Sequence, residues 1–191
     1  MDLKQLVLDQ LAGQATGKIA KLQGLDKSTA YSAVDTAVTA IIAGLQQNVS
    51  TKSGAGKLDA ALASKHQGSI LADVTAALDD ASVQEDGVKI LSHIFGDKKG
   101  AVTDSVAKQA GVSTAAAGDI LGQLAPIVLD QLGKTKKSDG LDAGDLVNIL
   151  VGQKTSDTAV GSVIQDILGG KRKGLVGIVL ALLTLFLAKK K

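Results

Sequence analysis

The sequence predicts an all-α protein built from short helices packed against one another. Apolar residues recur at spacings of three and four, and no segment shows the sustained alternation that is typical of a β-strand. Hydrophobic residues make up 45% of the 191 residues but aromatic residues only 2%, so the core must consist of Leu, Ile, Val and Ala. Such side chains suit helices that cross closely, with small residues at the crossings.

Clusters of Gly, Ser and Asp interrupt the apolar runs and set the expected helix ends. We expect helices at residues 2–12, 14–23, 27–48, 57–65, 69–79, 86–95, 99–110, 114–132, 142–151, 159–168 and 174–190. Pro126 falls inside the helix at 114–132, where it should remove one backbone hydrogen bond and bend the helix.

An internal repeat appears when the chain is shifted by 87 residues. The shift places Gly24-Leu25 on Gly111-Val112. It also aligns one apolar helix stripe (Val34, Ala37, Ile41, Ile42, Leu45) with another (Leu121, Leu124, Val128, Leu129, Leu132). In each copy a short helix should end at a left-handed Gly, after which Asp26 or Ser113 caps a long apolar helix. We therefore predict a duplicated helical body at 1–170, with repeat units at about 3–65 and 90–151.

Two segments of the chain resemble a known bacterial family. They are Ile90-Leu91-Ser92-His93-Ile94-Phe95-Gly96 and, some thirty residues later, Leu124-Ala125-Pro126-Ile127-Val128. Over residues 3–150 the sequence resembles the YidB-like family, a domain of unknown function. The resemblance implies an all-α fold of packed short helices, and it implies no activity and no catalytic residue that could be carried over.

The two histidines are the first candidates for chemistry. His66 lies in the polar run Ser64-Lys65-His66-Gln67-Gly68, which reads as a loop. His93 stands between Leu91 and Ile94-Phe95, which favours a buried imidazole bonded to a backbone carbonyl. A catalytic or zinc site would need partners that converge on one of them, and none is visible. We expect no enzyme, no metal and no other cofactor.

Two further motifs fail on their spacing or residue types. The run Ser138–Asp145 lacks the acidic positions and the Glu of an EF-hand, so we read it as a loop with Asp142 capping the next helix. The run Val106–Gly118 resembles a helix-turn-helix, but its second helix begins with Thr, Ala and Gly rather than base-reading residues. We expect no nucleic-acid partner and no small-molecule substrate.

Several glycines lie within the expected helices: Gly17, Gly44, Gly122 and Gly161. A glycine inside a helix costs up to about 1 kcal/mol relative to alanine. We expect close helix approach to compensate. No glycine-rich turn follows an expected strand, so no phosphate-binding loop is present.

Charge is distributed unevenly along the chain. The net charge is +2, but six basic residues and no acidic residue lie within 171–191, so the rest carries about −4. This basic flank comprises Lys171, Arg172, Lys173, Lys189, Lys190 and Lys191. The N-terminus lacks the features of a secretory signal peptide, and the chain has no cysteine. We expect a cytoplasmic protein, with association to a membrane as an alternative.

The C-terminal segment, residues 171–191, is the most apolar part of the sequence. Between its basic flanks Thr184 is the only polar side chain of residues 175–188. The expected contact residues are Leu175, Val176, Ile178, Val179, Leu180, Leu182, Leu183, Leu185, Phe186 and Leu187. A helix that is apolar on all sides must be covered, since leaving it in water would cost roughly ten kcal/mol or more.

Three environments could cover this segment: copies of the same helix, lipid, or the protein's own core. Fourteen residues form a helix of about 21 Å, short of the roughly 30 Å of a bilayer core, although flanking lysines can reach toward the headgroups. We expect a non-catalytic structural protein that self-assembles into a homo-oligomer or filament through bundled C-terminal helices. The alternative is a membrane-associated binding module anchored by the same helix.

Overall fold

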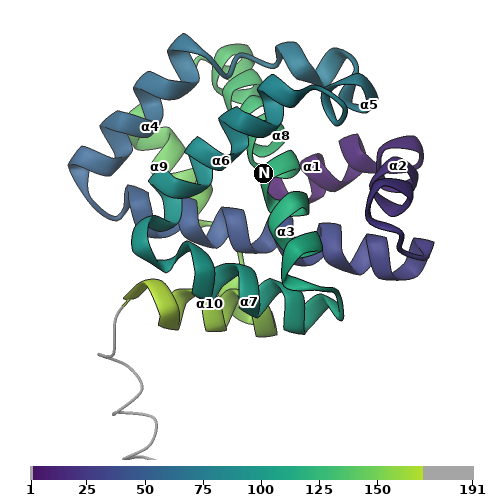
Figure 1. The fold of residues 1–191 in the computed structure, drawn as a ribbon. Helices are drawn as coiled ribbons and strands as arrows, with labels where there is room; N and C mark the ends of the chain where they lie inside the picture. Colours follow the sequence, from purple (N-terminus) through teal and green to yellow (C-terminus); the bar gives the residue numbers. More distant parts are fainter. Residues whose placement is uncertain (1, 170–191) are drawn as a thin grey trace, which may run out of the picture.

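The computed structural model describes residues 2–169, and all regular secondary structure in that range is helical (Figure 1). The longer helices are α1 (Leu3–Leu11), α2 (Gln14–Gln23), α3 (Lys27–Val49), α4 (Lys52–Ser64), α6 (Ala81–Phe95), α7 (Lys99–Ala110), α8 (Thr114–Asp139), α9 (Ala143–Val151) and α10 (Ala159–Gly169). Short turns η1 (Ser69–Ala72), α5 (Val74–Ala77), η2 (Gly96–Lys98) and η3 (Thr155–Asp157) connect them. The all-α prediction is confirmed. The expected helix at 174–190, together with every contact and basic-flank residue named above, lies outside the described residues.

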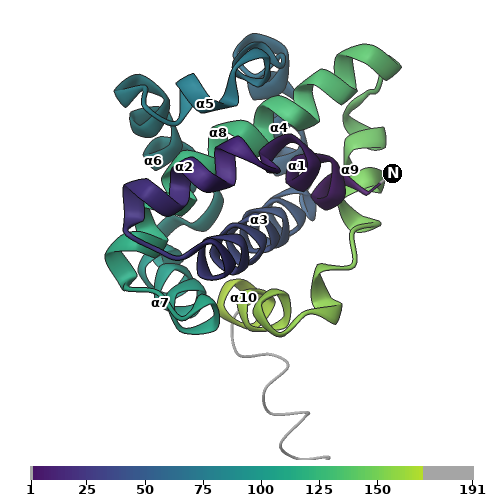
Figure 2. The same cartoon turned by 90° about the vertical axis from the view of Figure 1, so that its right-hand side faces the viewer.

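Helices α3 and α8 form the centre of the fold. Every residue from Thr36 to Leu45 and from Ile120 to Gly133 is buried, so both helices are covered on all sides. The two helices pack on each other, and the remaining helices surround them (Figure 2). Pro126 lies in the buried part of α8. The predicted apolar stripes therefore lie in one common core.

The two predicted turns have the same local geometry. Gly24 ends α2 at φ 62° and ψ 33°, and Gly111 ends α7 at φ 70° and ψ 33°. The Asp26 carboxylate then accepts hydrogen bonds from the first-turn N–H groups of α3, and the Ser113 hydroxyl does the same for α8. Both left-handed glycines and both caps are confirmed. The matched geometry supports duplication of the two repeat units, which stays a prediction.

The Asp26 cap should make stability depend on pH. Hydrogen bonds from the hydroxyls of Ser28 and Thr29 hold the pKa of Asp26 well below its ordinary value. The ionised cap therefore adds stability above about pH 4, and this is lost as pH falls through the lower, folded-state pKa. We expect wild type to exceed Asp26→Asn in unfolding free energy at pH 7, with the difference shrinking toward pH 2. Urea melts followed by circular dichroism measure this.

The matched cap at Ser113 supplies the control for that experiment. Its hydroxyl does not titrate in this range, so the loss caused by Ser113→Ala should stay constant between pH 7 and pH 2. A pH-independent difference between wild type and Asp26→Asn would contradict the assigned role of the charge.

Close approach is confirmed at two of the four predicted helix glycines, Gly44 and Gly161. A Cβ atom at Gly44 would overlap the side chains of Ile94 and Phe95, and one at Gly161 would overlap the carbonyl of Thr155. A Cβ atom at Gly122 would meet no neighbouring atom. The carbonyl oxygen of Gly122, however, would overlap a Cβ atom added at Gly87 of α6. Gly17 is open, so packing does not explain that glycine.

Some helix boundaries differ from the expected ones. Helix α4 begins at Lys52 rather than residue 57, because Thr51 accepts a hydrogen bond from the N–H of Gly54 and caps it. Helix α6 begins five residues early because Asp80 caps it. Helix α8 continues through a polar stretch to a left-handed Gly140. Residues 69–79 form two short turns rather than one helix.

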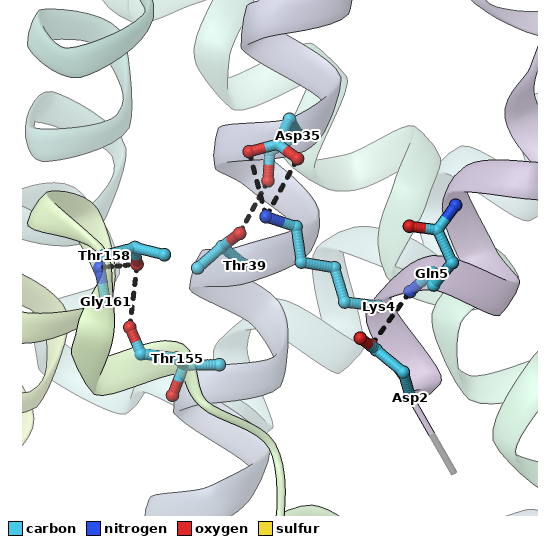
Figure 3. Close-up of polar contacts among 8 residues, drawn as sticks. All are labelled: Asp2, Lys4, Gln5, Asp35, Thr39, Thr155, Thr158 and Gly161. Carbon is cyan, nitrogen blue, oxygen red and sulfur yellow. Dashed lines mark hydrogen bonds and ion pairs between the residues drawn. The ribbon is translucent and has the colours of Figure 1, made fainter.

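The helices at the two ends of the described chain are both attached to α3. Lys4 of α1 forms an ion pair with Asp35 of α3 at 2.8 Å (Figure 3). The Leu3 N–H donates to Gln153 Oε1 at 2.9 Å. Helix α10 lies beside α7 and packs on α3 (Figures 1 and 2). Among residues 2–169, no single helix is long and apolar enough to cross a membrane; segments 81–110 and 114–139 meet the criterion only together, with a 106° bend between them.

Candidate functional site: the cleft between helices α4 and α6

A cleft of about 700 Å3 lies between α4 and α6 and is also lined by the last turns of α3. It is lined by Leu45, Gln47, Asn48, Ser50, Thr51, Ser53, Gly54, Lys57, Leu58, Ala61, Ser64, Lys65, His66, Asp86, Lys89, Ile90, His93, Ile94 and Leu129. This volume lies within the range of roughly 300–1,000 Å3 that small-molecule pockets occupy. Both histidines of the chain line it.

The lining has an apolar base and a polar rim. Five aliphatic side chains at the base are almost completely buried: Leu45, Leu58, Ile90, Ile94 and Leu129. Lys57, Lys65 and Lys89 are exposed residues on the rim. Residues 86, 89, 90, 93 and 94 follow helical spacing, so one face of α6 forms one wall.

His66 is buried within the lining by its partnership with α8. Its Nδ1 lies 3.0 Å from Oδ1 of Asp130, whose side chain is only 2% exposed. The other oxygen of Asp130 accepts a hydrogen bond from the Ile70 N–H at 3.1 Å. Because a carboxylate can only accept, Nδ1 of His66 carries the hydrogen in this pair, which fixes the orientation of the ring.

The second ring nitrogen of His66 faces α6. Its Nε2 lies 3.6 Å from Oδ2 of Asp86, a half-buried carboxylate in the cleft lining. The backbone of His66 can approach α8 so closely because position 133 is glycine, where a Cβ atom would overlap the His66 carbonyl. The pair therefore depends on two positions one turn apart on α8, Asp130 and Gly133.

The structure confirms the predicted loop position of His66 and contradicts the predicted burial of His93. His66 does lie in a connection, but it is buried, with 6% of its surface exposed. His93 does bond a backbone carbonyl, that of Lys89 at 2.8 Å, but it is exposed. The prediction of a buried His93 is therefore wrong. Its apolar neighbours Leu91, Ile94 and Phe95 are buried, whereas His93, which also lines the cleft, is exposed.

The imidazole of His66, oriented by the Asp130 carboxylate, resembles one part of an acid–base catalytic site. Within residues 2–169, no side-chain hydroxyl forms a hydrogen bond with His66, and no group of three or more His, Cys, Asp or Glu side chains could hold a metal ion. The geometry presents a fixed ring nitrogen and rim cations to whatever occupies the cleft.

The two other sequence motifs have structural roles. Asp142 caps α9 by accepting from the N–H groups of Gly144 and Asp145, as predicted, and these hydrogen bonds lower its pKa. The turn after α7 leads into α8, whose residues 120–133 are buried in the core.

The fold and the cleft define a class of protein: an all-α domain wrapped around two buried helices, with a mixed apolar and polar cleft at its surface. A family model described as bacterial protein of unknown function (DUF937) matches residues 5–135. The chain belongs to this family, in agreement with its YidB-like resemblance. No curated protein and no solved structure matches the chain.

Proposed function

We propose that this chain is a non-catalytic structural protein that self-assembles into a homo-oligomer or filament through its C-terminal segment. The observation that best supports this proposal is that α3 and α8 are already covered on all sides by helices of residues 2–169. The central core therefore leaves no buried position for fourteen further apolar residues, whose composition requires a covered environment.

Helix α10 is suited to attach such a segment to the body. Val160 and Ile164 are buried, and its first turn is fixed because Thr158 Oγ1 accepts from the Gly161 N–H at 3.1 Å and donates to the Thr155 carbonyl at 2.7 Å (Figure 3). At its other end Gly169 is exposed. The chain thus leaves α10 at the surface, where a neighbouring copy could contact the C-terminal segment.

A second candidate is a membrane-associated binding module. The observation that favours it is the charge pattern, with three basic residues on each side of the apolar run and a body of net charge about −4. Basic residues next to an apolar segment are attracted to anionic lipid, whereas an acidic body is repelled from it. Both candidates are consistent with a cytoplasmic body, and neither requires a reaction.

Removing residues 174–191 tests whether the C-terminal segment contacts other molecules, as both candidate functions require, or is buried in the core of its own chain. We expect the truncated protein to keep its helical circular dichroism while its size falls from an assembly or a membrane-bound form to a small species, because the body carries its own core. Size-exclusion chromatography measures the change. A monomeric intact protein, or unfolding of the truncated body, would overturn the proposal.

Two double variants and a sedimentation measurement refine this experiment. Leu180→Asp with Leu183→Asp should also reduce the size, because a carboxylate in a dry interface costs several kcal/mol, and Leu180→Met with Leu183→Met should leave it unchanged. Sedimentation with and without anionic liposomes then distinguishes the two candidates. Large size without liposomes supports self-assembly, and pelleting only with liposomes supports the membrane module.

A further inference from the structure

The cleft between α4 and α6 is held open by fixed polar contacts. On one side, Asp59 of α4 forms an ion pair with Lys136 of α8 at 2.7 Å, and His66 at the end of α4 is held by Asp130. On the other side, Asn48 Nδ2 donates to the carbonyl of Ile94 in α6 at 2.8 Å. Each wall is thus attached to the central helices, and the His66 and Asp86 side chains, 3.6 Å apart, join the two walls within the lining.

The rim of this cleft carries unpaired positive charge. The ammonium groups of Lys57, Lys65 and Lys89 form no hydrogen bond or ion pair with any other residue of 2–169, whereas Lys4, Lys18 and Lys136 are paired elsewhere on the body. Asp86 is the only acidic residue in the lining, and it faces His66. Three free cations thus gather around an apolar base in a body whose net charge is negative.

We infer that this cleft binds an anionic amphiphile, a carboxylate or phosphate head group on an aliphatic chain. The aliphatic chain would cover Leu45, Leu58, Ile90, Ile94 and Leu129, and the head group would pair with the rim lysines. The protein's own C-terminal segment fits this cleft poorly, because its basic flanks would meet a basic rim. The site is separate from the proposed assembly segment.

Isothermal titration calorimetry of the full chain with dodecanoate, below its micelle concentration, tests the inference. We expect one site per chain, similar binding of dodecyl phosphate, and binding of dodecanol at least about tenfold weaker, because it lacks the charge. Lys57→Ala with Lys89→Ala should weaken dodecanoate binding about tenfold or more. The matched control is Lys27→Ala with Lys99→Ala, two lysines outside the lining, which should leave binding unchanged.

A second pair of variants tests the apolar part of the site. Ala61→Trp places an indole in the lining of α4 and should abolish binding, whereas Ala60→Trp, at the neighbouring exposed position outside the lining, should not. Equal binding of dodecanol and dodecanoate, or unchanged binding in the double-lysine variant, would overturn the inference. So would binding that survives Ala61→Trp or disappears with residues 174–191, since both would place the ligand elsewhere.

Discussion

Replacing Gly87 with alanine should destabilise the protein by roughly 3 kcal/mol or more. Gly87 is buried in α6 at its crossing with α8, and an added Cβ would overlap the carbonyl oxygen of Gly122. Backbone atoms of two packed helices cannot yield as a flexible side chain can, so the helices must separate and expose Ile120 and Leu121 beside the crossing. Urea denaturation followed by circular dichroism measures the loss.

The control for this substitution is Gly56→Ala. Gly56 lies inside α4, is exposed, and has no atom near the position of an added Cβ. The same chemical change there should stabilise the protein by about 0.5–1 kcal/mol, because alanine favours the helix. If both variants melt alike, helix propensity rather than close approach governs position 87.

The region that the family model covers contains the proposed cleft site but not the proposed assembly segment. The family model covers residues 5–135, which include every residue of the cleft lining. Helix α10 and the C-terminal segment lie beyond it. A ligand in the cleft would therefore belong to the family domain, and assembly would be a property added by the residues beyond that domain.

Most of the fold could be predicted because its helix signals are local. Asp26, Ser113, Gly24 and Gly111 cap or end helices through hydrogen bonds that reach only a few residues, so the sequence near each turn determines them. The predicted start of α4, residue 57, is five residues too late, because residues 52–56 contain two glycines, which have low helix propensity. In the structure a Cβ at Gly54 would overlap the Asn48 carbonyl, so glycine allows α4 to begin close to the end of α3.

The candidate site could not be predicted because it depends on contacts between distant residues. His66 and Asp130 are 64 positions apart, and no local pattern around His66 indicates burial. One signal was present: Asp130 interrupts an apolar stretch of α8 between Leu129 and Leu132, and a carboxylate there needs a buried partner. The cleft itself arises from how α4 and α6 are attached to α8 and α3, which periodicity does not reveal.

Replacing Asp130 with alanine should cost about 3–5 kcal/mol of stability. The substitution removes the acceptor of both the His66 Nδ1–H group and the Ile70 N–H, leaving two polar groups unpaired at a site that is almost completely buried. Asp130→Asn keeps the shape and one acceptor oxygen, so its loss should be smaller. Asp119→Ala, at an exposed position of the same helix, should change stability by no more than about 0.5 kcal/mol.

A double-mutant cycle distinguishes the coupling energy between His66 and Asp130 from the loss of stability that any change of packing in the core would cause. His66→Phe with Asp130→Leu replaces both polar partners by apolar ones, and a buried pair replaced in this way often keeps its stability. We therefore expect the double variant to be more stable than Asp130→Leu alone, because the single variant leaves the His66 ring nitrogen buried without its acceptor. Additive losses in the two single variants would show that His66 and Asp130 contribute independently, and that their pairing does not stabilise the position of His66 in the cleft lining.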